Sequence, residues 1–179
     1  PSTSPIHVHE VQQATLTVTA DPKTIAYGDF DPPFTFQYSG FLLGDDAADI
    51  DTHPICDAPT PHVNAGTYPG IIECAGALDD NYIFAFVDGT LTVNPKALTV
   101  TADNQGKTYG YTLNFNGTEF TTTGLIFADT VTSVTLTSAG APPAAPTGTY
   151  PVVPSAAVGT GLGNYTITYV NGTMTVGGN

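Results

Sequence analysis

A short acidic segment has the residue types that bind a hard cation. Four carboxylates fall close together, at Asp45, Asp46, Asp49 and Asp51. Calcium takes oxygen ligands from loops of this kind, but the segment lacks the Asp-x-Asp-x-Asp-Gly spacing and the terminal Glu of an EF-hand. A solvated acidic turn has the same composition. The solvated turn is therefore the favoured interpretation, calcium is the one candidate ligand, and no other cofactor is expected.

The sequence contains no recognisable catalytic constellation. A serine or cysteine nucleophile needs a neighbouring base, which is most often histidine. The four histidines all precede residue 63, and none stands in a Gly-x-Ser-x-Gly or comparable context. His7 and His9 would share one face of a strand, but no second pair follows to complete a metal site. We therefore predict a protein that is not an enzyme and that holds no metal through histidine.

The chain has two cysteines, Cys56 and Cys74. They form no Cys-x-x-Cys pair, and no third cysteine is present to complete a zinc or haem site. The segment 58–66 between them carries prolines and a glycine that suit a long hairpin connection, which would bring the two residues within disulfide distance. An even cysteine count in a chain of extracellular composition predicts a disulfide, and two buried free thiols are the alternative.

The charge balance excludes two classes of partner. The 179 residues include 16 Asp and Glu against 3 Lys and no Arg, for a formal net charge of −13. Binding to nucleic acid or to an anionic membrane needs clustered basic residues, and none are present. The apolar runs are also far shorter than the roughly 20 residues needed to span a bilayer. We expect no nucleic acid and no membrane insertion.

The elements that must position these residues are repeated. Leu16-Thr17-Val18-Thr19-Ala20-Asp21 recurs as Leu98-Thr99-Val100-Thr101-Ala102-Asp103. Four further anchors recur in the same order, with a drift of one residue: the Tyr-Gly pairs at 27 and 109, the Gly-Thr-Tyr-Pro runs at 66 and 148, the Asn-Tyr pairs at 81 and 164, and the Gly-Thr pairs at 89 and 172. Ordered self-similarity of this kind marks tandem modules. We assign an N-terminal segment 1–13, module one at 14–95 and module two at 96–179, joined by a short linker that favours a semi-rigid rod.

Both modules have the side-chain period of β-strands. Phe34, Phe36 and Tyr38 alternate with polar residues, and so do Tyr111, Leu113 and Phe115 in the second copy. This period-two pattern predicts strands in both segments. The Asp-Gly pair at 88 and the Asn-Gly pair at 171 each stand between two β-rich runs, which predicts a hairpin turn or a β-bulge. The one helical candidate, Asp45–Ile50, is a single turn at most.

The repeated anchors resemble the MBG domain of the YGX type, which occurs in tandem in large bacterial surface proteins and adhesins. The resemblance rests on Tyr27-Gly28, Gly44-Asp45-Asp46 and Ala65-Gly66-Thr67-Tyr68 in the first copy, and on Tyr109-Gly110 and Gly148-Thr149-Tyr150 in the second. It covers nearly the whole chain from Ala14 onward. It implies a secreted, non-enzymatic structural or adhesive role at the bacterial cell surface, and it carries no catalytic residues to transfer.

The fold class follows from the strand pattern. We predict an all-β chain of two tandem modules, each an Ig-like β-sandwich. A β-grasp arrangement is the alternative, but it needs a substantial helix that the sequence does not contain.

Three functions remain open on these grounds. The first is a structural or adhesive repeat that forms an extracellular stalk or surface fibre, with neighbouring repeats or copies of itself as partners. The second is a filament subunit that polymerises by strand addition, with Ile6, Val8 and Val11 of the N-terminal segment as the donor strand. The third is a module that binds a glycan or a protein through exposed tyrosines.

Overall fold

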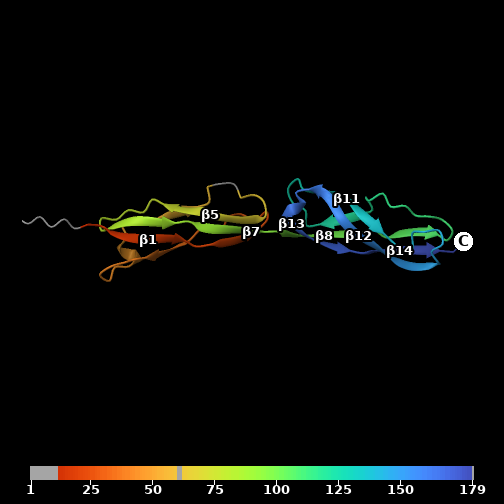
Figure 1. Cartoon of the computed structure of the whole chain (residues 1–179), viewed down its shortest axis with the longest axis horizontal. Coiled ribbons are helices and arrows are strands. Elements are labelled where there is room, and N and C mark those ends of the chain that lie inside the picture. The colour runs from red at the N-terminus through yellow and green to blue at the C-terminus, as the bar shows by residue number, and fades with distance from the viewer. Residues whose placement is uncertain (1–11, 60–61, 179) are drawn as a thin grey trace, which may run out of the picture. The chain divides into compact units, whose positions relative to one another are not determined.

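The computed structural model describes residues 12–59 and 62–178, and strands make up most of this part of the chain (Figure 1). Within it, the helical elements are two three-residue 3-10 turns, η1 (Ala47–Asp49) and η2 (Leu162–Asn164). The prediction of an all-β chain is confirmed. The single helical turn expected within Asp45–Ile50 is present as η1. The candidate donor-strand residues Ile6, Val8 and Val11 lie outside the described residues.

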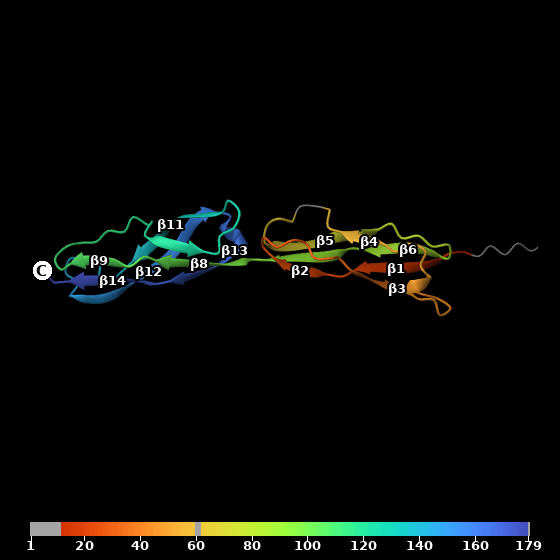
Figure 2. The same cartoon turned by 180° about the vertical axis from the view of Figure 1, so that it is seen from behind.

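The first repeat forms two sheets. Its strands are β1 (Ala14–Ala20), β2 (Lys23–Ala26), β3 (Phe36–Ser39), β4 (Ile55–Asp57), β5 (Gly66–Ala75), β6 (Tyr82–Val87) and β7 (Gly89–Asn94). A three-stranded sheet has the order β3-β1-β6, and a four-stranded sheet has the order β2-β7-β5-β4. β1 is antiparallel to β3 and parallel to β6, and the three strands lie side by side in Figure 2.

The second repeat has the same arrangement of sheets. Its strands are β8 (Lys96–Ala102), β9 (Gln105–Thr108), β10 (Phe120–Thr123), β11 (Thr130–Thr137), β12 (Gly148–Thr160), β13 (Tyr165–Val170) and β14 (Gly172–Gly177). The sheet orders are β10-β8-β13 and β11-β12-β14-β9. Two sheets in each repeat agree with a sandwich-like fold, and the three-residue turns are far shorter than the helix of a β-grasp.

The chain divides into two compact units, and their boundaries differ from those of the two repeats. Unit 2 comprises the chain from Val93 onward together with two short segments of the first repeat, Ala26–Asp29 and Val63–Gly66. Unit 1 comprises the rest of the described residues. Two loops of the first repeat therefore complete the fold of unit 2.

The recurring Leu-Thr-Val-Thr-Ala segment contributes buried side chains to the core of each repeat. In β1 the side chains of Leu16, Val18 and Ala20 are buried while the threonines between them face outward, and β8 repeats the pattern. Leu16 packs in a cluster with Ile50 and Tyr82. Burial of alternate residues is what a strand with one covered face requires, so the period-two prediction is confirmed for these strands.

The Asp-Gly and Asn-Gly hairpin prediction is wrong. β6 and β7 do not pair with each other, because β6 lies in the three-stranded sheet and β7 in the four-stranded sheet. Asp88 and Gly89 instead carry the chain from one sheet to the other. A Cβ at Gly89 would lie 3.0 Å from the carbonyl oxygen of Ala20, and one at Gly172 would lie 2.5 Å from that of Ala102. Glycine is needed here for close backbone approach rather than for a turn.

The strand predicted over Tyr111, Leu113 and Phe115 is also wrong. This segment is irregular, and its backbone groups bond outside any ladder: Lys107 Nζ donates to the carbonyl of Tyr111 at 2.8 Å, and Leu113 N–H donates to the carbonyl of Ala141 at 3.0 Å. The second-copy partner of β8 is β10, which begins at Phe120. In the first copy, β3 begins at Phe36, so Phe34 precedes the strand.

The turn before β10 is held by one carboxylate. Glu119 Oε1 accepts the backbone N–H of Asn116 at 2.9 Å, and its Oε2 accepts those of Gly117 at 2.9 Å and Thr118 at 3.0 Å. The bond from Asn116 is the largest cause, and together these bonds hold the pKa of Glu119 below its usual value. The ionised carboxylate therefore stabilises unit 2.

We expect Glu119→Gln to lower the free energy of unfolding by about 1 kcal/mol at pH 7, because an amide replaces a charged acceptor. The pKa of Glu119 is lower in the folded than in the unfolded protein. Its contribution is therefore fully present above the unfolded pKa of about 4.3 and is lost as the pH falls through the folded value. Urea titrations of both proteins at descending pH measure the difference, which should shrink on acidification. Glu73→Gln, at an exposed site on β5, is the control, and a difference that persists undiminished in acid would contradict the prediction.

Candidate functional site

The four candidate calcium ligands serve separate local purposes. Asp46 caps the η1 turn: its Oδ1 accepts the N–H of Ala48 at 2.7 Å, while Asp49 Oδ2 accepts the N–H of Asp46 at 2.8 Å. Asp45 accepts the hydroxyl of Tyr82 at 2.8 Å, and Asp51 is exposed beyond the turn. Over residues 12–59 and 62–178, no group of three His, Cys, Asp or Glu side chains is placed to hold a metal ion. The solvated acidic turn stays the prediction, with calcium binding as its alternative, and an equal melting temperature in EDTA and in millimolar Ca²⁺ would exclude calcium binding.

The two cysteines form a disulfide. Cys56 on β4 lies directly opposite Cys74 on the antiparallel strand β5, and their Cα atoms are 4.0 Å apart. Both belong to the hairpin that the prolines of the connecting segment indicate. The bond ties the three-residue strand β4 to the ten-residue strand β5. The second repeat has Ala156 where the first has Cys74. The second repeat therefore has no equivalent of this disulfide.

The described histidines take part in local contacts. His53 Nδ1 lies 3.1 Å from the hydroxyl of Tyr38, and His62 Nε2 lies 2.7 Å from Asp31 Oδ1. Neither contact includes a serine, threonine or cysteine that a histidine could activate as a nucleophile. His7 and His9 lie outside the described residues.

Tyr27 is the residue that sequence reasoning missed. The turn Ala26–Asp29 belongs to unit 2, and there Tyr27 is only 3% exposed. Its hydroxyl donates to Asp129 Oδ2 at 2.9 Å. Its ring makes edge-on contacts with the rings of Phe127 and Tyr165, each with centroids 5.5 Å apart. A tyrosine that buries its ring and satisfies its hydroxyl in this way anchors the turn that carries it.

Asp129 accepts a second tyrosine hydroxyl in the same place. Tyr165 donates to Asp129 Oδ2 at 2.7 Å and accepts the N–H of Ile126 at 3.0 Å. Burial, followed by the nearby Asp129 carboxylate, raises the pKa of Tyr27, and burial is also the largest cause of the raised pKa of Tyr165. Both hydroxyls therefore stay protonated as donors at neutral pH.

Asn164 and Gly28 complete the fit of the turn. Asn164 is 7% exposed; its Oδ1 accepts the N–H of Ala65 at 2.8 Å and its Nδ2 donates to Asn64 Oδ1 at 3.2 Å. Gly28 has a φ of +90°, and a Cβ there would overlap Cδ1 of Ile126. In the Tyr-Gly pair, the tyrosine ring thus packs among the residues around Asp129, and the glycine allows the backbone of the turn to lie close to Ile126. We call Ile126, Asp129, Asn164 and Tyr165 the unit 2 socket.

The corresponding residues of the first repeat form a second socket, which we call the unit 1 socket: Leu42, Asp45, Asn81 and Tyr82. Its hydrogen bonds repeat those of the unit 2 socket. The Tyr82 hydroxyl donates to Asp45 Oδ2 at 2.8 Å and accepts the N–H of Leu42 at 2.9 Å. That N–H lowers the pKa of Tyr82, but burial and the Asp45 carboxylate outweigh it and the pKa is raised overall.

A cavity lies at the unit 1 socket, lined by counterparts of the residues that contact Tyr27 in the unit 2 socket. It has a volume of about 330 Å³, and its lining includes all four residues of the unit 1 socket together with Leu43. Leu43 is fully exposed and has a φ of +60°, while its counterpart Phe127 has a φ of +55°. The two loops thus share an unusual backbone conformation, and one of them contacts a tyrosine ring.

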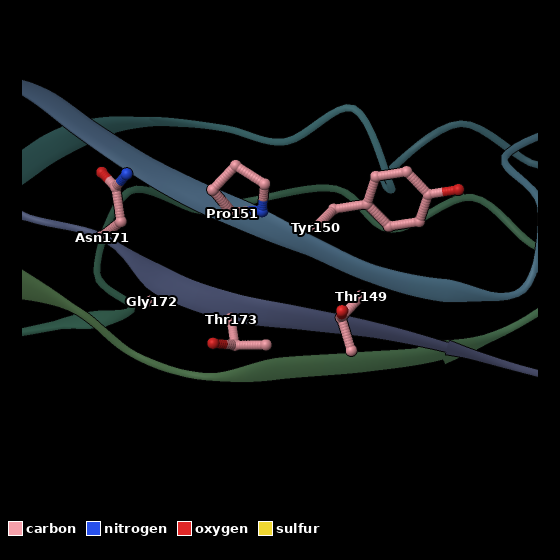
Figure 3. A pocket seen from close by; sticks show the side chains of 6 residues that line it. All are labelled: Thr149, Tyr150, Pro151, Asn171, Gly172 and Thr173. Carbon is pink, nitrogen blue, oxygen red and sulfur yellow. The ribbon is translucent and has the colours of Figure 1, made fainter.

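A second hollow lies on the surface of the second repeat. It has a volume of about 370 Å³ and is lined by residues 149–151 of β12 and residues 171–173 at the start of β14, whose side chains Figure 3 shows. The ring and the threonine side chains are of the kind that contact sugars and peptides. The Tyr150 hydroxyl already donates to the carbonyl of Pro146 at 2.9 Å. Binding of a glycan or a protein at exposed tyrosines stays a prediction.

A search of residues 12–59 and 62–178 for a helix of sufficient length and apolarity to cross a membrane found none.

Comparison with known proteins identifies the repeat. Residues 16–92 and residues 98–175 each match the family described as MBG domain (YGX type). The Tyr-Gly pairs and both sockets fall inside these two matches. No curated protein and no solved structure is significantly similar to the chain.

Proposed function

The chain belongs to the YGX-type MBG domain family over most of its length, and from this premise we propose that it is a non-enzymatic structural or adhesive repeat protein of a bacterial cell surface. Its role is that of a stalk or fibre that carries tension between its ends. The partners it needs are neighbouring repeats or copies of itself, with a host or cell-surface glycan or protein as the adhesive target. The disulfide supports an oxidising, extracellular location.

The observation that carries this proposal is the position of the first and last strands in each repeat. β1 lies between β3 and β6, and β7 lies between β2 and β5; β8 and β14 are likewise inner strands of their sheets. Tension along the chain would therefore pull on strands that are hydrogen-bonded on both sides. Such a strand has ladder hydrogen bonds on both sides to break, whereas an edge strand has them on one side only.

Single-molecule stretching of the whole chain tests the structural part. We expect two separate unfolding events, one for each repeat. Cys56 and Cys74 are 18 positions apart in the sequence, and the disulfide keeps the chain between them from extending. The first repeat should therefore release about 60 Å less chain than it does after reduction. The second repeat is the internal control, because its extension should not respond to reductant. Extension at low force with no resolved events would contradict a tension-bearing role.

Antibody labelling of intact cells that make the protein tests the location. Labelling without permeabilisation is expected, with an antibody to a cytoplasmic protein as the control. Labelling that appears only after permeabilisation would contradict the proposal. Deletion of residues 1–13 tests the alternative of a filament subunit, because a truncated chain that still assembles excludes strand donation through Ile6, Val8 and Val11.

A further inference from the structure

The two sockets of this chain differ in what fills them. In the unit 2 socket, Asp129 accepts two tyrosine hydroxyls, one from Tyr165 and one from Tyr27. In the unit 1 socket, Asp45 accepts the hydroxyl of Tyr82 and no second tyrosine among the described residues. The cavity of about 330 Å³ lies beside this pair. The unit 1 socket therefore has the acceptor, the backbone turn and the space that hold a Tyr-Gly turn elsewhere in the same molecule.

The two Tyr-Gly turns differ in exposure, as the two sockets differ in what they hold. Tyr27 is 3% exposed, whereas its counterpart Tyr109 is 47% exposed. Gly28 and Gly110 have nearly the same backbone conformation, with φ of +90° and +89°. A Cβ at Gly28 would overlap Ile126, whereas one at Gly110 would meet nothing within 4 Å. The described residues thus include one docked Tyr-Gly turn, one exposed Tyr-Gly turn and one socket that holds neither of them.

We propose that the Tyr109–Gly110 turn of a second copy of this chain docks in the unit 1 socket. The Tyr109 hydroxyl donates to Asp45, as that of Tyr27 does to Asp129, and its ring fills the cavity against Tyr82. The inference rests on the socket geometry, and it goes beyond the proposed surface role by naming the contact through which two copies of the chain would meet.

A polar contact beside the ring supports the same partner. Asn164 Oδ1 accepts the N–H of Ala65 in unit 2. The counterpart of Asn164 is Asn81, which is exposed and lines the cavity. The counterpart of Ala65 is Thr147, which is also exposed. A docked second copy would give Asn81 the N–H of Thr147. The side-chain bond from Asn164 to Asn64 would have no equivalent, because Pro146 stands at the position of Asn64.

The contact joins two different surfaces, so it does not close on itself. Among the described residues there is one exposed Tyr-Gly turn and one socket that no Tyr-Gly turn fills, and a heterologous contact of this kind builds open linear assemblies. A contact between one turn and one socket is expected to bury little surface, and the net charge of −13 opposes association of two chains. Association should therefore be weak at low ionic strength and should increase with added salt, which screens the repulsion between exposed charges.

Sedimentation velocity of the whole chain from about 10 μM to about 1 mM, at high salt, tests the proposal. The average sedimentation coefficient of the wild-type protein should rise with concentration. Tyr109→Ala removes the exposed turn's ring, and Leu42→Arg fills the socket from a side chain that is 52% exposed. Each variant alone should stay a monomer with an unchanged melting temperature. Leu42→Arg also lowers the negative charge, so its loss of association could not come from added repulsion.

An equimolar mixture of the two variants is the decisive sample. Tyr109→Ala keeps its socket and Leu42→Arg keeps its turn, so together they can form one contact and no more. The mixture should associate and stop at a dimer, while the wild-type protein grows further. A chain that lacks residues 1–11 should associate as the wild type does. A wild-type protein that stays monomeric up to 1 mM, or variants that associate on their own, would overturn the proposal.

Discussion

Reduction of the Cys56–Cys74 disulfide should lower the free energy of unfolding of the first repeat by about 3 kcal/mol. The bond closes a loop with a sequence separation of 18 residues, and the entropy that it removes from the unfolded chain corresponds to about this value. The folded structure adds a local reason. β4 has three residues and pairs with β5 alone, and its Ile55 is 79% exposed. Without the bond, little apolar burial holds β4 in place.

Hydrogen exchange read by mass spectrometry, with and without reductant, measures this effect repeat by repeat. Peptides from β4 and β5 should lose protection on reduction, while those from β11 and β12 should not change, because Ala156 replaces the cysteine there. The double variant Cys56→Ala/Cys74→Ala should behave as the reduced protein does and should not respond to reductant. Two reactive thiols in the unfolded, non-reduced protein would contradict the prediction.

Local patterns predicted the features that local chemistry determines. The alternation in Leu16-Thr17-Val18-Thr19-Ala20 predicts, in an all-β chain, a strand whose apolar side chains face the core, and this is the orientation observed. The prolines and glycine between the cysteines suit a hairpin, and the disulfide follows from that hairpin. In both cases the residues that decide the structure are close in sequence to the residues that they position.

The failures concern glycines and aromatics whose partners lie elsewhere in the chain. Asp88-Gly89 has the composition of a hairpin turn, yet the glycine is required because the carbonyl of Ala20 passes beside it. Tyr27 and Asp129 are 102 residues apart, and no short-range pattern links them. The repeat contained the available signal: the Tyr-Gly pair, the aspartate at 45 and 129, and the Asn-Tyr pair recur in the same order. Residues that recur without a strand period indicate a contact rather than a strand face.

Tyr27→Ala should destabilise unit 2 by about 3–4 kcal/mol. Truncation of a buried aromatic ring costs about this much through lost burial and the cavity left behind. The ring of Tyr27 is 3% exposed and contacts Phe127 and Tyr165. Tyr27→Phe keeps these contacts and removes one donor, so its effect should be about 1 kcal/mol, because Asp129 still accepts the Tyr165 hydroxyl. Urea unfolding followed by hydrogen exchange in unit 2 measures both variants.

Alkaline pH should have a related effect on the same site. Burial is the largest cause of the raised pKa of both Tyr27 and Tyr165. For Tyr27, the Asp129 carboxylate is the next cause. A raised pKa means that the protonated hydroxyl is favoured in the folded protein. The contribution is therefore fully present below the unfolded pKa of about 10 and is lost as the pH rises through the folded values. Unit 2 should consequently lose stability above about pH 10, and the Tyr27→Phe variant should lose less of it.

Tyr109→Ala is the matched control for these effects, because it makes the same substitution at the same position of the other repeat. Tyr109 is 47% exposed, so the change should alter the free energy of unfolding by less than about 0.5 kcal/mol in a dilute sample. The contrast between the two tyrosines separates the contribution of the socket from any intrinsic preference of the Tyr-Gly turn for an aromatic residue. Equal losses in the two variants would mean that the turn itself needs the ring. A loss in Tyr27→Ala alone would show that the unit 2 socket, through Asp129 and its neighbours, is the source of the stability.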